Sequence, residues 1–287
     1  MKLIAIDLDG TLLQLDGTIS EVNRQAIDRV QEAGHRVTIC SGRALHDILE
    51  ILRKNQIEAS IIAGNGALVY HEKILQHLTL PVPIVRKLIE WAESTDLYYE
   101  IYTNEGILSP EHGRKLLEKE RDQLLAMDSR KNRESLNRKI AIQFDQHHLQ
   151  IVPDLKKLDF AKNAPYKFYI CSFFPEKRQT FQEKLAELDN VSLTSGASAV
   201  IEVGHPDASK AFGLKYLADY FHIPLKNTVA IGDNLNDISM FQVAGISIAM
   251  ANGREEAKQA ATYVTKSRDE DGVAYALKKY VLGDKTG

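Results

Sequence analysis

Cysteine, tryptophan and long apolar runs are scarce in this sequence. It has two cysteines and one tryptophan among 287 residues, and its net charge is −3. Cys40 and Cys171 lie far apart without metal-ligand spacing, which excludes a disulfide scaffold and favours buried free thiols in a reducing, cytoplasmic setting. No apolar stretch approaches the ~20 residues that span a bilayer, and no signal peptide is apparent at the start. The small net charge gives no general reason to expect a nucleic-acid partner.

What is present is the composition of an ordinary globular protein, with 44% hydrophobic and 26% charged residues and enough length for two domains. Near the start, short apolar runs alternate with stretches in which apolar residues recur at helical spacing. Ser20 is a suitable N-cap for the first helix, and Gly34 ends it. This alternation is typical of a parallel α/β sheet. The expected strands are 3–6, 36–40 and 59–63, with helices between them.

The pattern changes in the middle of the chain. From about Pro81 to Val203, helices and strands follow one another in α+β order, which favours an open, mainly antiparallel sheet with one covered face. A polar stretch over 128–138 is expected to be a connection or a frayed helix end. The expected helices are 84–93, 111–127 and 178–188, and the expected strands are 97–103, 139–144, 166–173, 191–194 and 199–203.

Beyond Pro206 the α/β pattern returns, with a helix that starts near Ser209. Strands are expected at 228–231, 246–250 and 263–265, and the helices that follow them are expected to end near 244, 261 and 280. The sequence therefore predicts a Rossmann-like, parallel-sheet α/β core made of residues 1–81 and 204–287. An α+β cap domain over 82–203 is inserted in it, which is tolerated where chain ends lie close together at a surface.

Polar residues follow four of the strands that are expected to be parallel. Because ligands bind outside the carboxyl ends of such strands, these residues are expected to form one site. Residues two apart in an extended chain point the same way, so Asp7 and Asp9 are expected to face one pocket. The four segments are Asp7 with Asp9, Ser41-Gly42-Arg43, Gly64-Asn65-Gly66, and Gly232-Asp233-Asn234-Leu235-Asn236-Asp237.

The residue types of these segments fit phosphoryl transfer. Ser41 and Gly42 are expected to open a helix, whose free N–H groups favour an anion such as phosphate. Lys210, at the start of the helix that re-enters the core, offers an ammonium that neutralises phosphate and carboxylate charge. Such positioning and charge neutralisation supply most of the catalysis in phosphoryl transfer. The carboxylates that offer oxygen ligands for Mg²⁺ are Asp7, Asp9, Asp233 and Asp237.

Several of these residues also have structural explanations. Ser41 and Ser209 are suitable helix N-caps, and we expect Ser41 to act both as a cap and at the site, and Ser209 only as a cap. Arg43 is suited equally to facing the site and to a salt bridge on a helix surface. Asn65-Gly66 is a common turn pair. We therefore treat Arg43, Asn65 and Gly66 as candidate substrate contacts only.

In this order, the segments resemble the four motifs of the haloacid dehalogenase superfamily of hydrolases. Asp7-Leu8-Asp9-Gly10-Thr11 and the segment from Gly232 to Asp237 are the specific ones. Ser41-Gly42-Arg43 is short, and Lys210 is identified by its place in the order. The large insertion between the second and third motifs is similar to that of the Cof-type branch, subfamily IIB, whose members are phosphatases.

The resemblance implies a role for each residue. Asp7 would be the nucleophile that forms an aspartyl-phosphate, and Asp9 would protonate the leaving alcohol and then activate water. Mg²⁺ would be held by the Asp7 carboxylate, the Asp9 backbone carbonyl and Asp233, with Asp237 behind them. The groups that would hold the transferring phosphoryl group are the Leu8 backbone N–H, Ser41, Gly42, Lys210 and Asn236.

The expected activity is Mg²⁺-dependent hydrolysis of phosphomonoesters of small metabolites. The resemblance leaves the substrate open among sugar phosphates, flavin mononucleotide or a ribityl-pyrimidine phosphate, and pyridoxal phosphate. The alternatives are a phosphomutase of the same superfamily and a non-catalytic phosphoacceptor or ligand-binding module. The expected partner is a small phosphorylated metabolite, with no nucleic acid and no membrane, and the chain is expected to be a monomer or a homodimer.

Overall fold

The protein, seen in a computed structural model, is described over residues 1–128, 130–160, 162–194 and 199–284. It forms two compact units. The core unit consists of Met1–His77 and Asp207–Gly287, and the insert unit consists of Leu78–Pro206. None of the helices in the described ranges combines the length and the apolar character that a bilayer span needs.

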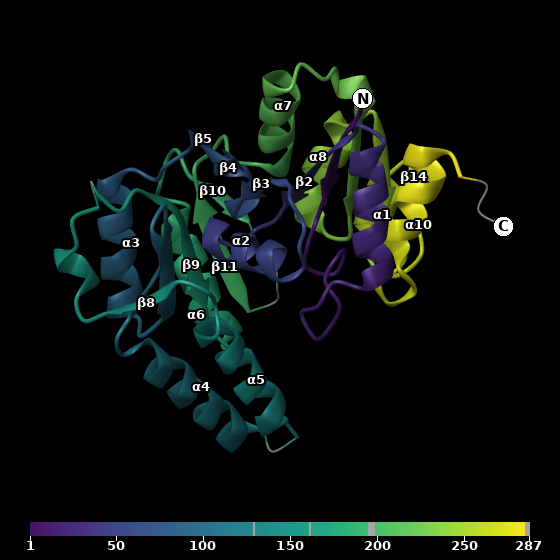
Figure 1. Ribbon diagram of the computed structural model, residues 1–287. Helices are drawn as coiled ribbons and strands as arrows, with labels where there is room; N and C mark the ends of the chain where they lie inside the picture. Colours follow the sequence, from purple (N-terminus) through teal and green to yellow (C-terminus); the bar gives the residue numbers. More distant parts are fainter. Residues whose placement is uncertain (129, 161, 195–198, 285–287) are drawn as a thin grey trace. The chain divides into compact units, whose positions relative to one another are not determined.

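The core unit is built on one sheet (Figure 1). Strands β14, β13, β12, β1, β2 and β3 lie in this order and are parallel, and β4 and β5 extend the sheet as an antiparallel hairpin. The pairing of β1 with β12 joins the two sequence segments of the core unit. The bounds are β1 Leu3–Ile6, β2 Arg36–Cys40, β3 Ser60–Ala63, β4 Leu68–His71, β5 Lys73–His77, β12 Thr228–Gly232, β13 Ile246–Ala249 and β14 Tyr263–Val264.

Apolar residues cover both faces of the central strands. Leu3 and Ala5 of β1 pack with a cluster that includes residues of three core helices, and Ile4 and Ile6 of the same strand are also fully buried. Ser20 caps the first helix as predicted, because its side chain accepts a hydrogen bond from the Asn23 amide. The helices are α1 Glu21–Glu32, α2 Leu45–Lys54, α7 Lys210–Tyr220, α8 Ile238–Val243, α9 Glu255–Ala260, α10 Gly272–Ala276, the π-helical turn Leu277–Leu282, and the 3-10 turns Gly64–Gly66, Leu225–Asn227, Leu235–Asp237 and Arg268–Glu270.

The insert unit has its own sheet, in the order β10-β11-β9-β6-β7-β8. Every pair is antiparallel except β7 with β8. The sequence therefore predicted its mainly antiparallel character correctly. The bounds are β6 Tyr98–Thr103, β7 Gly106–Pro110, β8 Leu149–Val152, β9 Pro165–Cys171, β10 Ser192–Thr194 and β11 Val200–Gly204.

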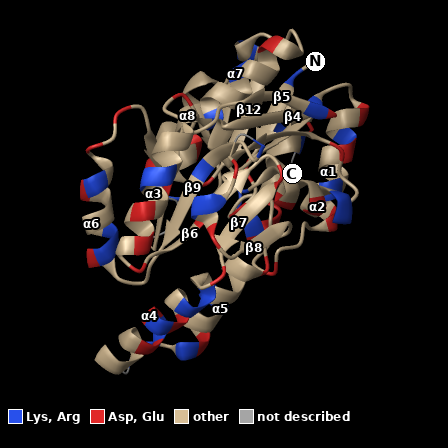
Figure 2. Ribbon diagram, turned by 90° about the vertical axis from the view of Figure 1, so that its left-hand side faces the viewer, with Lys and Arg blue, Asp and Glu red and all other residues tan. Residues whose placement is uncertain are grey.

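One face of this sheet packs against α3 and α6. Tyr99 and Ile101 of β6 lie in one apolar cluster with Leu88 of α3 and Phe181 of α6. Lys and Arg alternate with Asp and Glu along α4 and α5, so these helices present charge of both signs (Figure 2). The insert helices are α3 Val82–Ser94, α4 Gly113–Met127, α5 Arg133–Phe144, α6 Pro175–Leu185 and the 3-10 turn Leu155–Lys157.

The strand predicted over 139–144 is wrong, because these residues form the second half of α5. Ile140 and Ile142 alternate with other residues as in a strand, yet Ile142 is 56% exposed. The buried pair is Leu136 and Ile140, four residues apart on one helix face. The Asn132 side chain accepts a hydrogen bond from the Ser135 amide and starts the helix inside the predicted connection. Residue 129 of that connection lies outside the described residues.

Candidate active site

Asp7 lies directly after β1, at the carboxyl edge of the core sheet. Its amide still donates to the Ile231 carbonyl of β12, at 2.9 Å, so its backbone is held by the neighbouring strand. The Asp7 side chain is 7% exposed. Oδ1 accepts a hydrogen bond from Lys210 Nζ at 2.5 Å, whereas Oδ2 is buried without a partner among the described residues. A buried carboxylate oxygen without a hydrogen-bond partner destabilises the folded state unless a bound ligand interacts with it.

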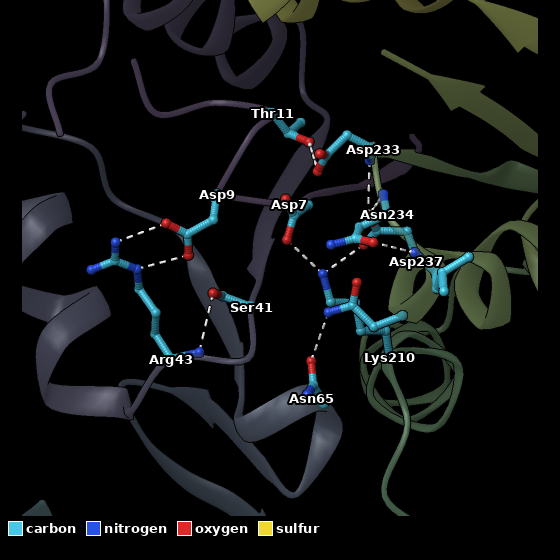
Figure 3. Close-up of polar contacts among 12 residues, drawn as sticks. Asp7, Asp9, Thr11, Ser41, Arg43, Asn65, Lys210, Asp233, Asn234 and Asp237 are labelled. Carbon is cyan, nitrogen blue, oxygen red and sulfur yellow. Dashed lines mark hydrogen bonds and ion pairs between the residues drawn. The ribbon is translucent and has the colours of Figure 1, made fainter. Parts of the chain in front are cut away.

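Lys210 is the first residue of α7, whose N-cap is Ser209, as the sequence predicted. Its ammonium is buried and donates to Asp7 Oδ1 and, at 2.6 Å, to Asp237 Oδ1. Burial acts to lower the pKa of Lys210, but the charges of Asp237 and Asp7 hold it well above its ordinary value. Lys210 is therefore a fixed cation between two carboxylates (Figure 3).

Asp237 holds the loop that follows β12. Its Oδ2 accepts hydrogen bonds from the amides of Asp233 and Asn234, at 2.8 and 2.9 Å. Gly232 allows this close approach, because a Cβ on it would lie 2.4 Å from the Asp237 carboxyl carbon. Both oxygens of Asp237 are thus engaged, one by backbone amides and the other by Lys210. This arrangement orients Asp233, whose Oδ1 accepts a hydrogen bond from Thr11 Oγ1 at 3.1 Å.

The residues present fit a divalent cation. One carboxylate oxygen from each of Asp7, Asp233 and Asp237 lies within 4.8 Å of the others. Burial raises the pKa of Asp7 well above its usual range against the opposing charge of Lys210, and repulsion from Asp237 and Asp233 adds to the rise. Burial and the charge of Asp237 raise the pKa of Asp233 to about 6. A hard cation would relieve this repulsion and complete Asp7 Oδ2.

Asp9 has different surroundings. Its side chain is 56% exposed, and Arg43 binds both of its oxygens, with Nε 2.8 Å from Oδ2 and Nη2 2.7 Å from Oδ1. The prediction that Asp7 and Asp9 face one pocket is wrong in this structure. The strand ends at Ile6, and the chain then turns, because the Leu8 carbonyl accepts hydrogen bonds from the amides of residues 11, 12 and 13. The two carboxylates therefore point to different partners (Figure 3).

Arg43 also pairs with Asp47, through Nη1 at 2.6 Å from Oδ2. Asp47 was not predicted as part of the site; it lies in the first turn of α2, and Arg43 precedes this helix in the sequence. The Asp47 side chain is only 5% exposed. Arg43 therefore forms the predicted salt bridge and reaches toward the site as well, by way of Asp9.

Ser41 and Gly42 do not open a helix, which corrects the prediction. The N-cap of α2 is Ala44, and the helix begins at Leu45. The Ser41 hydroxyl instead accepts a hydrogen bond from the Arg43 amide at 3.2 Å. The chain bends at Gly42 and Arg43 before the helix. The loop after β3 holds this bend, because the amides of Asn65 and Gly64 donate to the carbonyls of Ser41 and Arg43, each at 3.0 Å.

The loop after β3 joins two other parts of the site. Asn65 is buried at φ +56°, and its Oδ1 accepts a hydrogen bond from Asn236 Nδ2 at 3.0 Å. Gly66 packs against the start of α7, since a Cβ on it would lie 1.9 Å from the Ser209 carbonyl oxygen. All four predicted segments therefore lie at one edge of the core sheet, and Gly66 supports the helix that carries Lys210.

The sequence matches the family of haloacid dehalogenase-like hydrolases over residues 4–277. Two similar proteins come from Bacillus subtilis (strain 168). Phosphatase YwpJ is 35% identical over 283 residues, covering 97% of this chain and 99% of that protein. The 5-amino-6-(5-phospho-D-ribitylamino)uracil phosphatase YwtE is 35% identical over 285 residues, covering 99% of each.

A solved haloacid dehalogenase-like hydrolase from B. subtilis has the same fold, with a TM-score of 0.84 at 34% identity over 98% of this chain and 100% of that one. Family match, relatives and fold agree with the order of the four motifs along the sequence. The chain belongs to the haloacid dehalogenase-like hydrolases, in their Cof-type branch, and is a phosphoric monoester hydrolase.

Proposed function

We propose that this phosphatase is Mg²⁺-dependent and hydrolyses phosphomonoesters of small cytoplasmic metabolites through a phosphorylated Asp7. The observation that carries the proposal is the asymmetry of the Asp7 carboxylate. Lys210 neutralises one oxygen, while the other is buried and unpartnered among the described residues. A nucleophile held in this way keeps its position, and the nearby cation favours an incoming phosphate.

In the first step a carboxylate oxygen of Asp7 forms a bond to phosphorus, and the bond from phosphorus to the alcohol oxygen breaks. Asp9 gives that oxygen a proton. In the second step Asp9 accepts a proton from water, whose oxygen bonds to phosphorus and releases phosphate from Asp7. For both steps the Asp9 carboxyl must exchange its present partner, Arg43, for the reacting groups.

The remaining site residues hold charge in place. By the family resemblance, the Leu8 backbone N–H, Ser41, Gly42 and Asn236 hold the phosphoryl group together with Lys210. Asp7, the Asp9 backbone carbonyl and Asp233 hold Mg²⁺, with Asp237 behind them. Bound Mg²⁺ supplies positive charge that offsets the phosphoryl oxygens. Of the candidate substrate contacts, Arg43 and Asn65 remain in the proposal, whereas Gly66 is explained by its packing against Ser209.

For the substrate we propose a phosphate ester of a polyol or sugar, with or without an attached ring. The support is the relative YwtE, whose name specifies a phosphorylated ribitylaminouracil. Flavin mononucleotide, pyridoxal phosphate and sugars phosphorylated on a primary alcohol share this type of ester and belong in the same comparison.

The test is the initial rate of phosphate release from this set of esters, with and without Mg²⁺, for the wild type and for Asp7→Asn. We expect Mg²⁺-dependent release, and none from Asp7→Asn, because an amide is not a nucleophile. Accumulation of an isomeric sugar phosphate without release of phosphate would indicate a phosphomutase. No turnover of any ester, or of a generic aryl phosphate, would indicate a binding module.

A further inference from the structure

Asn252, in the loop after β13, links two segments of the core unit through its side-chain amide. Its Nδ2 donates to the Gly10 carbonyl at 2.8 Å, and its Oδ1 accepts from the Arg268 amide at 2.7 Å. Both ends of the amide are therefore fixed, although the side chain is exposed. None of the four motifs includes this residue.

The loop that carries Asn252 is itself fixed to the site. The Arg254 amide donates to the Asp233 carbonyl at 2.8 Å, and the Met250 amide donates to the Gly232 carbonyl at 2.9 Å. Gly253 packs against Asp233, because a Cβ on it would lie 2.7 Å from the Asp233 carbonyl oxygen. The loop from which Asn252 binds the Gly10 carbonyl is therefore hydrogen-bonded to the loop that carries Asp233.

Gly10 directly follows Asp9, so its peptide groups set the direction of the Asp9 backbone. It has φ +87°, and its Cα faces Asp233, since a Cβ would lie 2.4 Å from Asp233 Oδ2. The amides of Thr11 and Leu12 fix the inner side of the turn by donating to the Leu8 carbonyl. Asn252 binds a second carbonyl of this turn, that of Gly10.

We propose that Asn252 is a positioning residue for Asp9. By holding the Gly10 carbonyl, it fixes the backbone from which the Asp9 side chain turns between Arg43 and the leaving-group oxygen. Movement of Asp9 is then a rotation of its side chain about a fixed Cα, and the carboxyl reaches the same place in each cycle. This inference rests on the proposed function, in which Asp9 protonates the leaving group. Misplacement of such a group by about 1 Å costs up to ~10²-fold in rate.

The test compares leaving groups. An alkyl phosphate needs a proton on its departing oxygen, whereas 4-nitrophenyl phosphate has a leaving group that departs as an anion. We expect Asn252→Ala to lower kcat/KM for the alkyl ester about tenfold or more, and for the aryl ester about twofold at most, since positioned proton transfer contributes ~10²–10⁴-fold. Only steps up to leaving-group departure contribute to kcat/KM, so the later role of Asp9 as a base does not enter.

Two further variants separate positioning from stability. Asn252→Asp keeps an acceptor for the Arg268 amide but loses the donor to Gly10, and should show the same selective loss. Gln14→Ala removes a comparable bond to the same segment, from Gln14 Nε2 to the Arg268 carbonyl at 3.1 Å, without touching Gly10, and should leave the alkyl-to-aryl ratio unchanged. The alkyl-to-aryl ratio does not depend on the fraction of folded enzyme, because both esters are assayed with the same enzyme preparation. Equal losses on both esters, or no loss, would overturn the proposal.

The variant Asp9→Asn, alone and combined with Asn252→Ala, separates the proposed role of Asp9 from that of Asn252. If Asp9 is the acid, Asp9→Asn alone lowers the alkyl-to-aryl ratio, and adding Asn252→Ala lowers it no further, because residues that act as a unit are not additive. An unchanged ratio in Asp9→Asn would overturn the proposed role of Asp9. A selective loss in Asp9→Asn without one in Asn252→Ala would overturn only the role of Asn252.

Discussion

The Lys210 ammonium is bound by two carboxylates, and each contact has a different consequence. The contact with Asp237 fixes the lysine to the loop after β12, and the contact with Asp7, the proposed nucleophile, favours the ionised form of that carboxyl. We expect Lys210→Ala to lower kcat at least ~10²-fold, as when one preorganised donor is removed. Phosphate release measured at saturating substrate tests this, with circular dichroism to establish folding. A well-folded variant that lost less than tenfold would contradict the role.

Glu100, in β6 of the insert unit, is buried with its Oε2 unpartnered among the described residues. Its Oε1 accepts hydrogen bonds from the Tyr98 hydroxyl and from Gln146 Nε2, at 2.6 and 2.8 Å. Burial raises its pKa to about 7, and these two bonds and the charge of Lys167 oppose the rise. The folded state thus holds the proton more tightly than the unfolded state, whose carboxyl has a pKa near 4.5. Stability should fall as the pH rises between these values and level off above pH 7.

We therefore predict that the free energy of unfolding of the wild type falls by about 3 kcal/mol between pH 4.5 and pH 7, at ~1.4 kcal/mol per pKa unit. Glu100→Gln should not show this decrease. The single tryptophan, Trp91 of α3, reports on the insert unit, so its fluorescence during urea unfolding measures the effect. Glu90→Gln is the control, because Glu90 is an exposed residue of α3, the helix that carries Trp91. Equal pH dependence in wild type and Glu100→Gln would rule out this carboxyl as the source.

Periodicity and capping predicted most of the helices and strands. The buried parallel strands were predicted because both of their faces are apolar, so their runs are continuous. The strand predicted over 139–144 failed because a residue pattern of period two also arises at the end of an amphipathic helix. The hairpin of β4 and β5 was missed, since β5 has no fully buried residue and so carries no strong apolar signal.

Gly66 shows how a short turn positions the helix that carries Lys210. It has φ +100°, and its Cα faces the Ser209 carbonyl at the start of α7. Gly66→Ala should therefore displace the first turn of α7 and with it Lys210, and lower both kcat and the melting temperature. Gly17→Ala is the control, because Gly17 has φ +83° but nothing within 4 Å of a Cβ. That variant bears only the backbone strain, of ~1–2 kcal/mol. Equal kcat in the two variants would show that α7 does not depend on this contact.

Across the whole chain, the sequence predicted which segments lie together at one edge of the core sheet. Asp7 and Lys210 are 203 positions apart, and strand order alone brought them to one edge, because ligands gather at the carboxyl ends of parallel strands. Side-chain directions beyond the strand ends were not predictable in the same way. The pairing of Asp9 with Arg43, and the bond from Asn252 to Gly10, depend on turns whose geometry leaves no periodic signal.

Because Asp7, Asp233 and Asp237, the carboxylates proposed to hold Mg²⁺, belong to the core unit, Mg²⁺ should stabilise the two units differently. Mg²⁺ at about 100 times its Kd should add ~2.7 kcal/mol to the core unit, since a ligand stabilises only the state that binds it. Hydrogen exchange measures this directly. Peptides over β1 and β12 should gain protection, peptides over β6 and β9 should not, and a chelator should reverse the gain. In Asp233→Asn the gain should be lost. Equal protection of both units in the wild type would mean that the insert unit unfolds together with the core.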